Sequence, residues 1–447
     1  MQSGKSRNAR RGRRIGLLVG AVAVALGIGG VGAGGAVAAP LCTGSNIIGE
    51  GASLQKVSQQ TTWIPGFQGP GGECFEKGTE PKVTYEALGS GAGLTAWDFN
   101  GPDAKPFDTS RGFTATDDAP TTTQIGNAET AAGGAKVLVI PVTQTSIAVA
   151  VNPPAECDVE ELTNKQFESI FRGNIKNWGK IDTAFGTGCA GAPITRVVRK
   201  DGSGTTFQFK NYLFQVNSAS LACTSPASTW KDLMPIGTGS KPNITWPENG
   251  VGGCGATTLS PVVTGAANGN GPLIEKVNAT DGSIGYAAIS DIESKKVAGT
   301  HSVRLQNNGL VKLANATFAE PAIEANKSAN CASAQYTVPA AARVGTGTGL
   351  SVDWSAVFGA APKIGGEDYP LCTLTYDMAL NDYSAKAGFT EAQVTTVRDY
   401  LTEYVVAATG QSDIANGESW YAPLPTSATP AFNVLGAAQL AAGKIAF

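Results

Sequence analysis

The chain has 447 residues, of which 15% are charged, and its formal net charge is −3. This length is sufficient for two or three domain-sized hydrophobic cores. So weak a charge provides no general attraction to nucleic acid or anionic lipid, and an anion site must therefore be built locally from a few donors. We accordingly expect no nucleic-acid partner, and the 57 glycines and 24 prolines indicate a loop-rich globular protein.

The N-terminus has the pattern of a secretory signal peptide. Six basic residues within the first 14 positions precede an uncharged run from Ile15 to Ala39 that ends in small residues. Cleavage between Ala38 and Ala39 fits an A-x-A-type site. A single uncleaved membrane anchor is the alternative reading of the same run. Leu41 before Cys42 is too large for a lipoprotein signal, so we expect a secreted or cell-surface protein without a lipid anchor.

Eight cysteines agree with export, because an even number in an extracytoplasmic chain is typical of disulfide bonding. No two of them have C-x-x-C spacing, so we expect no metal site. Pairing in chain order would close loops of roughly 30–40 residues, each worth about 3–4 kcal/mol in the chain-entropy model. The sequence leaves the connectivity open. The cysteines are Cys42, Cys74, Cys157, Cys189, Cys223, Cys254, Cys331 and Cys372.

Behind the signal, short β-rich runs alternate with helical patterns, which predicts an α/β protein. The apolar, β-branched run 137–151 suits a buried strand that crosses between two lobes. Apolar spacing predicts helices within 160–178 and 390–408. The Gly-, Asn- and Ala-rich stretches 237–271 and 307–366 indicate loop-heavy insertions that carry disulfides.

Three glycine-serine turns share one design, in which a hydroxyl stands at the beginning of a helical pattern. Glycines let the backbone approach a ligand, and a helix start presents unpaired N–H groups and a positive dipole end, which suit an oxyanion. Arg199, at the third turn, offers a fixed fork of donors to a dianion. Each turn taken singly also fits an ordinary helix N-cap. The turns are 49–54 (GEGASL), 88–93 (LGSGAG) and 199–206 (RKDGSGTT).

A fourth segment, 111–120 (RGFTATDDAP), places two adjacent acids, Asp117 and Asp118, before Pro120. An acid in this position also suits an ordinary turn. No nucleotide-binding loop of the G-x-x-x-x-G-K-[ST] type occurs in the sequence, and the G-x-G-x-x-G match at 27–32 lies within the signal.

An enzyme is the rival class of function. The sequence has one histidine, His301, in a loop-like segment where a solvated side chain is the ordinary interpretation. No G-x-S-x-G elbow occurs, and a Ser-His-Asp hydrolase would have to combine His301 with a serine far away in sequence. A phosphatase would need metal ligands or an activated nucleophile, and neither is visible. We therefore expect a binder and not an enzyme, with a secreted phosphatase or hydrolase and a surface adhesin as alternatives.

Taken together, these segments resemble the phosphate-binding subunits of phosphate ABC transporters. The resemblance extends from about Ile47 to Pro425 and is interrupted by the insertions. Its most specific piece is RKDGSGT at 199–205. The supporting pieces, in the family's order, are LGSGAG at 88–93, FTATDDAP at 113–120, IFRGNIKNW at 170–178, TWP at 245–247, GNG at 269–271, GSIGY at 282–286 and PLP at 423–425.

The resemblance implies an α/β type II periplasmic-binding-protein fold, in which crossing hinge strands join two lobes. Lobe 1 would comprise 39–143 and 374–447, lobe 2 would comprise 144–373 with its loop-rich insertions, and 1–38 would be the signal peptide. The return crossing would lie near 369–378 (YPLCTLTYDM). The family further implies an extracytoplasmic monomer that captures inorganic phosphate, without a cofactor, and delivers it to the membrane permease of an ABC-type importer.

The resemblance also implies a phosphate site with contributions from both lobes. Ser53, the amide of Leu54 and Ser90 would bind the anion from lobe 1. Asp117 would accept a proton of the anion, although Asp118 beside it leaves a one-residue ambiguity. The family usually has Thr-Phe where this chain has Ser53-Leu54, a change that keeps the hydroxyl and the N–H. From lobe 2, the implied ligands are Arg199, Ser203, Gly204 and Thr205, with Asp201 holding Arg199.

Overall fold

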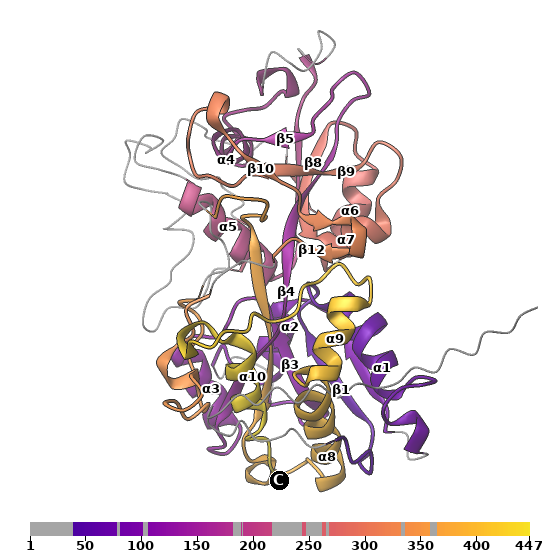
Figure 1. Cartoon of the computed structure of the whole chain (residues 1–447), viewed down its shortest axis with the longest axis vertical. Coiled ribbons are helices and arrows are strands. Elements are labelled where there is room, and N and C mark those ends of the chain that lie inside the picture. Colours follow the sequence, from indigo (N-terminus) through magenta and orange to yellow (C-terminus); the bar gives the residue numbers. More distant parts are fainter. Residues whose placement is uncertain are drawn as a thin grey trace, which may run out of the picture. The chain divides into compact units, whose positions relative to one another are not determined.

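The long strand β4 (Val137–Asn152) connects two groups of strands (Figure 1). Up to Ser146 it pairs antiparallel with β13 (Cys372–Leu380), and from Ile147 onward it pairs antiparallel with β8 (Ser283–Ala288). Every β4 residue except the last is buried, as expected for a continuous apolar run covered on both faces. The predicted crossing strand is therefore confirmed, and the predicted return strand is β13.

The protein is described here by a computed structural model. It covers residues 39–77, 81–101, 106–181, 189, 191–216, 244–246, 262–264, 268–331, 336–357 and 364–447. The predicted signal peptide, most of the predicted insertion at 237–271, and Cys223 and Cys254 lie outside these residues. Residues 36–447 form one compact unit. No helix within the described ranges combines the length and the hydropathy that a membrane span requires.

The first strand group has the order β2–β1–β3–β13–β4. Strand β1 (Ile47–Gly51) lies parallel to both β2 (Val83–Glu86) and β3 (Arg111–Thr116), and β13 runs antiparallel to β3. Parallel neighbours end at the same edge of a sheet, where the ligand sites of open α/β sheets lie. The segments that follow β1, β2 and β3 therefore meet at one edge. This group and the helices beside it are called the first lobe below.

The second strand group has the order β4–β8–β6–β7, and β9 (His301–Gln306) pairs with the same end of β4. Strand β6 (Thr195–Val198) lies parallel to β8 and to β7 (Val262–Thr264). The segments that follow these parallel strands again share one edge of the sheet. This group and its helices are called the second lobe below.

The two helices predicted from apolar spacing are present, with shorter bounds. Helix α4 (Asn164–Arg172) begins at a capping box formed by Thr163 and Gln166, and it ends where Gly173 adopts φ 86°. Left-handed backbone of this kind favours glycine, which explains the helix end. Helix α8 (Glu391–Tyr400) also begins at a capping box and continues into a π-helical turn.

The remaining elements are short and complete the two lobes. The other helices are α1 (Ile64–Gln68), α2 (Ser90–Ala96), α3 (Thr122–Ala131), α5 (Gly204–Val216), α6 (Asn270–Asn278), α7 (Ile289–Lys295), α9 (Ala408–Asn416) and α10 (Val434–Ala442), and the other strands are β5 (Glu161–Leu162), β10 (Phe318–Ala319), β11 (Ala322–Ile323) and β12 (Ser328–Ala329).

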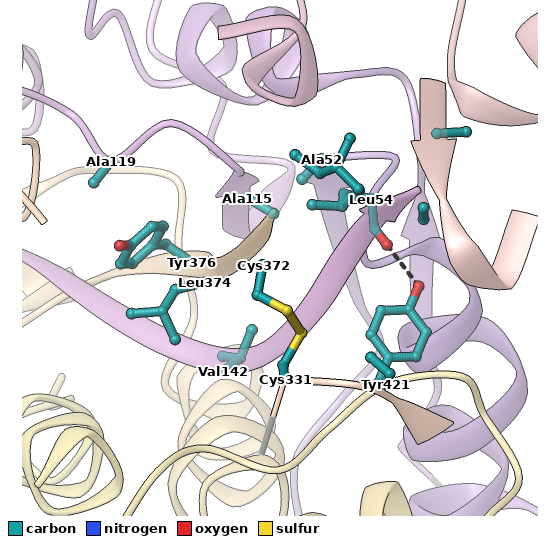
Figure 2. Close-up of a cluster of buried hydrophobic side chains, with 14 of the residues drawn as sticks. Ala52, Leu54, Ala115, Ala119, Val142, Cys331, Cys372, Leu374, Tyr376 and Tyr421 are labelled. Carbon is teal, nitrogen blue, oxygen red and sulfur yellow. Dashed lines mark hydrogen bonds between the residues drawn. A yellow bond between two sulfur atoms is a disulfide. The ribbon is translucent and has the colours of Figure 1, made fainter. Parts of the chain in front are cut away.

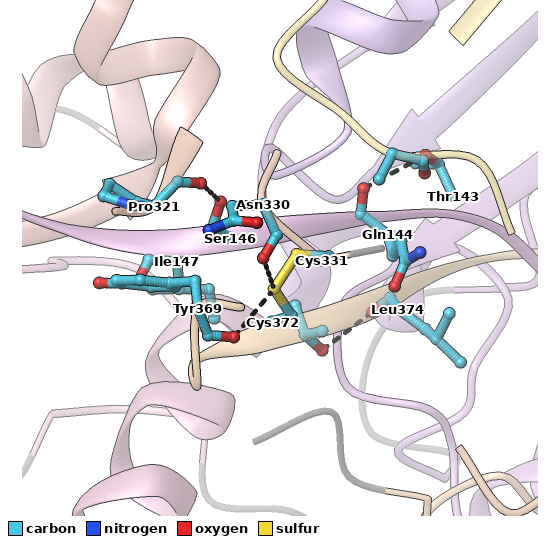
Figure 3. The surroundings of a disulfide bond; sticks show 12 residues. Thr143, Gln144, Ser146, Ile147, Pro321, Asn330, Cys331, Tyr369, Cys372 and Leu374 are labelled. Carbon is cyan, nitrogen blue, oxygen red and sulfur yellow. Dashed lines mark hydrogen bonds between the residues drawn. A yellow bond between two sulfur atoms is a disulfide. The ribbon is translucent and has the colours of Figure 1, made fainter. Parts of the chain in front are cut away.

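A disulfide lies where the crossing strands change partners. The bond Cys331–Cys372 spans 41 residues and ties the chain after β12 to the first residue of β13. In register, Cys372 lies opposite Ser146, the last β4 residue that pairs with β13 (Figure 3). The hydroxyl of Ser146 in turn donates a hydrogen bond to the carbonyl of Pro321. The crossing is thus held by covalent and hydrogen bonds as well as by strand pairing.

Two further disulfides close loops of similar size. Cys42–Cys74 and Cys157–Cys189 each have a sequence separation of 32 residues. The prediction of disulfide bonding is confirmed for these six cysteines, and their pairing follows the chain order considered above.

Candidate functional site

Asp117 lies at the shared edge of the first lobe, directly after β3, and only 1% of its surface is exposed. Its Oδ2 accepts hydrogen bonds from Ser90 Oγ at 3.3 Å and from Thr205 Oγ1 at 3.1 Å. The backbone N–H of Leu54 also donates to this carboxylate. Donors from the first, second and third predicted turns therefore converge on one carboxylate, and they come from both lobes.

Burial has the largest effect on the pKa of Asp117. It raises the pKa of the carboxyl to about 7, although the hydrogen bonds from Thr205, Ser90 and the Leu54 amide and the charge of Arg199 all act to lower it. Asp117 Oδ1 and the buried Ser53 Oγ have no hydrogen-bond partner among the described residues. Buried polar atoms are normally paired, so an acceptor and a hydroxyl are available here to a ligand.

Arg199 follows β6 and is held by a carboxylate and an amide. Its Nε donates to Asp201 Oδ1 at 2.8 Å, and its Nη2 donates to the other oxygen of Asp201. Its Nη1 donates to Asn270 Oδ1 at 2.7 Å. Asp201 thus binds the guanidinium through both carboxylate oxygens. Asn270 was not predicted as a site residue, and the GNG sequence at 269–271 was its only signal.

The third turn leads directly into α5. Ser203 Oγ accepts a hydrogen bond from Thr206 N at 3.2 Å, which is the geometry of an N-cap, and Ser203 N donates to the carbonyl of Ile244. Thr205, one residue into the helix, points its hydroxyl at Asp117. Ser203 thus acts as an ordinary helix N-cap, whereas the Thr205 hydroxyl points into the candidate site.

Glycine at position 204 allows α5 to approach the first lobe. A Cβ added there would lie 2.4 Å from Asp118 Oδ1 and 2.8 Å from Ser90 Oγ. Two hydrogen bonds accompany this approach: Gly91 N donates to the carbonyl of Gly202 at 3.1 Å, and the side-chain Nε2 of Gln208 donates to the carbonyl of Asp117 at 3.2 Å. The site residues of the two lobes therefore lie in direct contact.

The neighbouring acid, Asp118, has different surroundings. Its Oδ1 accepts a hydrogen bond from Thr116 Oγ1 at 2.7 Å. Burial raises the pKa of Asp118 to about 7, and the charge of Lys210 on α5 acts in the opposite direction. The Lys210 amine is itself buried, which lowers its pKa to about 7. Of the two acids, Asp117 is the one that contacts the hydroxyls of the glycine-serine turns.

The histidine considered for an enzyme contacts a backbone carbonyl. His301 is the first residue of β9 and not part of a loop, so that expectation was wrong, and its Nε2 lies 2.8 Å from the carbonyl of Val159. Within the described part of the chain, no group of three or more His, Cys, Asp or Glu residues could hold a metal ion.

Comparison with known proteins identifies the family. A model described as a PBP superfamily domain matches residues 50–404. The phosphate-binding protein PstS of Xylella fastidiosa is 29% identical over 234 residues, which are 51% of each chain. The phosphate-binding protein PstS 3 of Mycobacterium leprae is 26% identical over 350 residues, 77% of this chain and 76% of that protein. The chain thus spans about half the length of the first relative and about three quarters of the second.

Solved structures show the same architecture. The chain is similar to a high-affinity periplasmic phosphate-binding protein bound with phosphate, with a TM-score of 0.59, 21% identity and coverage of 85% of this chain and 91% of the other. It is also similar to a phosphate-binding protein from Stenotrophomonas maltophilia, with a TM-score of 0.56, 18% identity and coverage of 88% and 93%. The predicted α/β periplasmic-binding-protein fold is confirmed. Since the family model matches well over half of its residues, the chain belongs to the PBP superfamily, and the two relatives named above are phosphate-binding proteins.

Proposed function

We propose that this protein captures inorganic phosphate between its two lobes, outside the cytoplasm, and delivers it to the membrane permease of an ABC-type importer. The observation that carries the proposal is the surroundings of Asp117. Hydroxyls from both lobes and the Leu54 amide converge on this buried carboxylate, and the charge of Arg199 acts on it. The names of the two relatives described above, both phosphate-binding proteins, support the same ligand.

The proposed roles follow from the chemistry of each group. Hydroxyl and amide donors bind oxyanion oxygens, and an arginine balances the charge of a dianion with a fixed fork of N–H groups. When it is ionised, a buried carboxylate is only an acceptor, so in that form it can face the anion only where the anion carries a proton. The proposed ligands are Ser53, the Leu54 amide, Ser90, Asp117, Arg199, Ser203, Gly204 and Thr205, with Asp201 as the support of Arg199.

This chemistry distinguishes phosphate from sulfate. Near neutral pH, phosphate carries at least one proton and sulfate carries none. Asp117 Oδ1, which has no partner among the described residues, could accept that proton in a charge-assisted hydrogen bond. Sulfate would set a lone pair against the same buried oxygen, and two unpaired acceptors in contact would cost several kcal/mol.

The proposal includes two lobes with the boundaries predicted from the sequence, 39–143 with 374–447 and 144–373. Closure of the lobes about the crossing strands would bury the anion, and opening would release it to the permease. We propose a monomer that binds without turnover. A phosphatase on the same fold would need an activated nucleophile or a metal ion.

Calorimetric titration of the mature protein with phosphate and sulfate tests the proposal, together with incubation with p-nitrophenyl phosphate. We expect saturable binding of phosphate at a 1:1 ratio, no heat of binding with sulfate, and no release of p-nitrophenol. Absence of phosphate binding would refute phosphate capture, and steady release of p-nitrophenol would support the phosphatase alternative.

A further inference from the structure

The hydroxyl of Tyr421 joins residues of the two lobes. It donates a hydrogen bond of 2.6 Å to the carbonyl of Leu54, in the first lobe (Figure 2). It also accepts a hydrogen bond of 3.2 Å from Ser290 Oγ, in the second lobe. All three residues are buried, with at most 1% of their surfaces exposed. Ser290 belongs to α7, which directly follows β8. Tyr421 thus bridges the edges of the two sheets where the anion site lies.

The backbone of Tyr421 is fixed to the crossing strands. Its neighbour Ala422 exchanges backbone hydrogen bonds with Gln144 of β4, at 2.9 and 3.2 Å. Its own carbonyl accepts a hydrogen bond from Ala329 of β12 at 3.2 Å. The tyrosine ring therefore extends from a segment that is bonded to the crossing strand β4. Its hydroxyl reaches the first glycine-serine turn, at 49–54, although Tyr421 itself belongs to none of the three turns.

From this geometry we infer that Tyr421 is a positioning residue that couples closure of the lobes to the first anion-binding turn. This inference rests on the proposed function. The Leu54 carbonyl bound by Tyr421 belongs to the residue whose N–H donates to Asp117. Opening about β4 and β13 would move Ser290 and Leu54 apart, so one hydroxyl could hold both only while the lobes are closed.

The expected effect follows from the burial of the three groups. Removal of the hydroxyl leaves the Leu54 carbonyl and the Ser290 hydroxyl without their partner in the closed form, whereas water can satisfy both once the lobes open. The loss therefore falls mainly on the closed, ligand-bound state. We expect phosphate affinity to fall about tenfold, chiefly through faster dissociation.

Tyr421→Phe and Ser290→Ala test the inference, with Tyr383→Phe as the matched control. Tyr383 is also fully buried, and its hydroxyl also donates a 2.6 Å hydrogen bond to a backbone carbonyl, that of Gly112 in the first lobe. Both tyrosine variants lose the same kind of bond, but only that of Tyr421 connects the lobes. Stopped-flow release of phosphate, calorimetric Kd and thermal unfolding without phosphate would be measured for each variant.

We expect all variants to lose some thermal stability, and only Tyr421→Phe and Ser290→Ala to release phosphate about tenfold faster. Equal release rates for Tyr421→Phe and the wild type would overturn the inference while leaving phosphate capture intact. Equally faster release from Tyr383→Phe would also overturn it, because the effect would then be one of stability alone. A wild-type protein that binds no phosphate would overturn the proposed function, and this inference with it.

Discussion

Thr205 Oγ1 donates a 3.1 Å hydrogen bond to Asp117 Oδ2, and the two residues are 88 positions apart in the sequence. Thr205 is the second residue of α5 in the second lobe, and Asp117 directly follows β3 in the first lobe. Because parallel strands bring their following segments to one edge, each lobe presents its polar turn at the surface that faces the other. This contact is the basis of the predictions that follow.

The choice between phosphate and sulfate should depend on Asp117. Asp117→Asn replaces an acceptor with a side chain that can donate an N–H to sulfate, so sulfate binding should strengthen by about 100-fold or more. Asp118→Asn is the matched control, because the side chain of Asp118 accepts a hydrogen bond from Thr116, whereas that of Asp117 accepts hydrogen bonds from Ser90 and Thr205. Calorimetry with both anions measures the effect. Sulfate binding by the Asp118 variant alone would mean that Asp118 faces the anion.

Gly204→Ala should prevent closure. The new Cβ would overlap Asp118 Oδ1 and Asp118 N, at 2.4 and 2.5 Å, and opening of the lobes relieves the overlap more easily than a backbone shift. Phosphate affinity should therefore fall by about 100-fold or more, while the melting temperature without phosphate changes little.

The matched glycine is Gly126, exposed within α3, where an added Cβ meets nothing within 4 Å. Gly126→Ala should leave phosphate affinity unchanged and raise stability by about 0.5–1 kcal/mol. Unchanged phosphate binding by Gly204→Ala would contradict the close interlobe contact described here.

Stability without phosphate should fall as the pH rises from about 4 to 7. Asp377 of β13 is fully buried, and burial raises its pKa from the usual 3.8 to about 7, even though Gln55 and Gln59 donate to its oxygens at 3.0 and 3.2 Å. Between these two pH values the folded protein holds a proton that the unfolded chain has lost. Stability therefore decreases with rising pH across this window, and this group adds no slope outside it.

Asp377→Asn isolates that contribution, since Asp377 contacts none of the proposed phosphate ligands through its carboxylate. We expect the wild type to lose roughly 1–3 kcal/mol more than the variant between pH 5 and pH 7.5. Urea unfolding in phosphate-free buffer gives both values. Parallel pH profiles for the two proteins would show that Asp377 is ionised in the folded state throughout.

Loss of the Cys331–Cys372 disulfide, at the crossing strands, should affect phosphate binding as well as stability. In the chain-entropy model, loss of Cys331–Cys372, with its 41-residue separation, costs about 4 kcal/mol. The Cys42–Cys74 bond, away from the crossing strands, is the comparison, with a similar expected cost. Paired Cys→Ser variants of both bonds should unfold at lower temperature. Only the Cys331–Cys372 variant should also release phosphate faster, because it loosens the crossing of β4 and β13.

The sequence predicted the parts of the site that have a local signature. Glycines before a hydroxyl at a helix start indicate an anion turn, and this pattern located Ser90 and Thr205, which do converge in the structure. An apolar run without polar alternation likewise predicted β4. The helices were predicted too long, because Gly173 and the π-helical turn after Tyr400 end the regular hydrogen bonding before the apolar spacing ends.

Residues that act through distant partners could not be predicted in the same way. Tyr421 contacts Leu54 across 367 positions, and Asn270 contacts Arg199 across 71. Such pairs leave no periodic pattern in the sequence, because the sheet topology alone brings them together. Asn270 lies within the GNG sequence at 269–271, and Tyr421 lies two residues before the PLP sequence at 423–425. Their position in or beside a segment that resembles the family was the only available signal.

A crystal structure of the mature protein with phosphate tests the central claim most directly. We expect one phosphate ion between the lobes, within hydrogen-bond distance of Ser53 Oγ, Asp117 Oδ1 and the Arg199 guanidinium. We also expect the Tyr421 hydroxyl to remain bonded to the Leu54 carbonyl in that complex. A phosphate ion bound elsewhere, or bound with Asp117 turned away from it, would contradict the account.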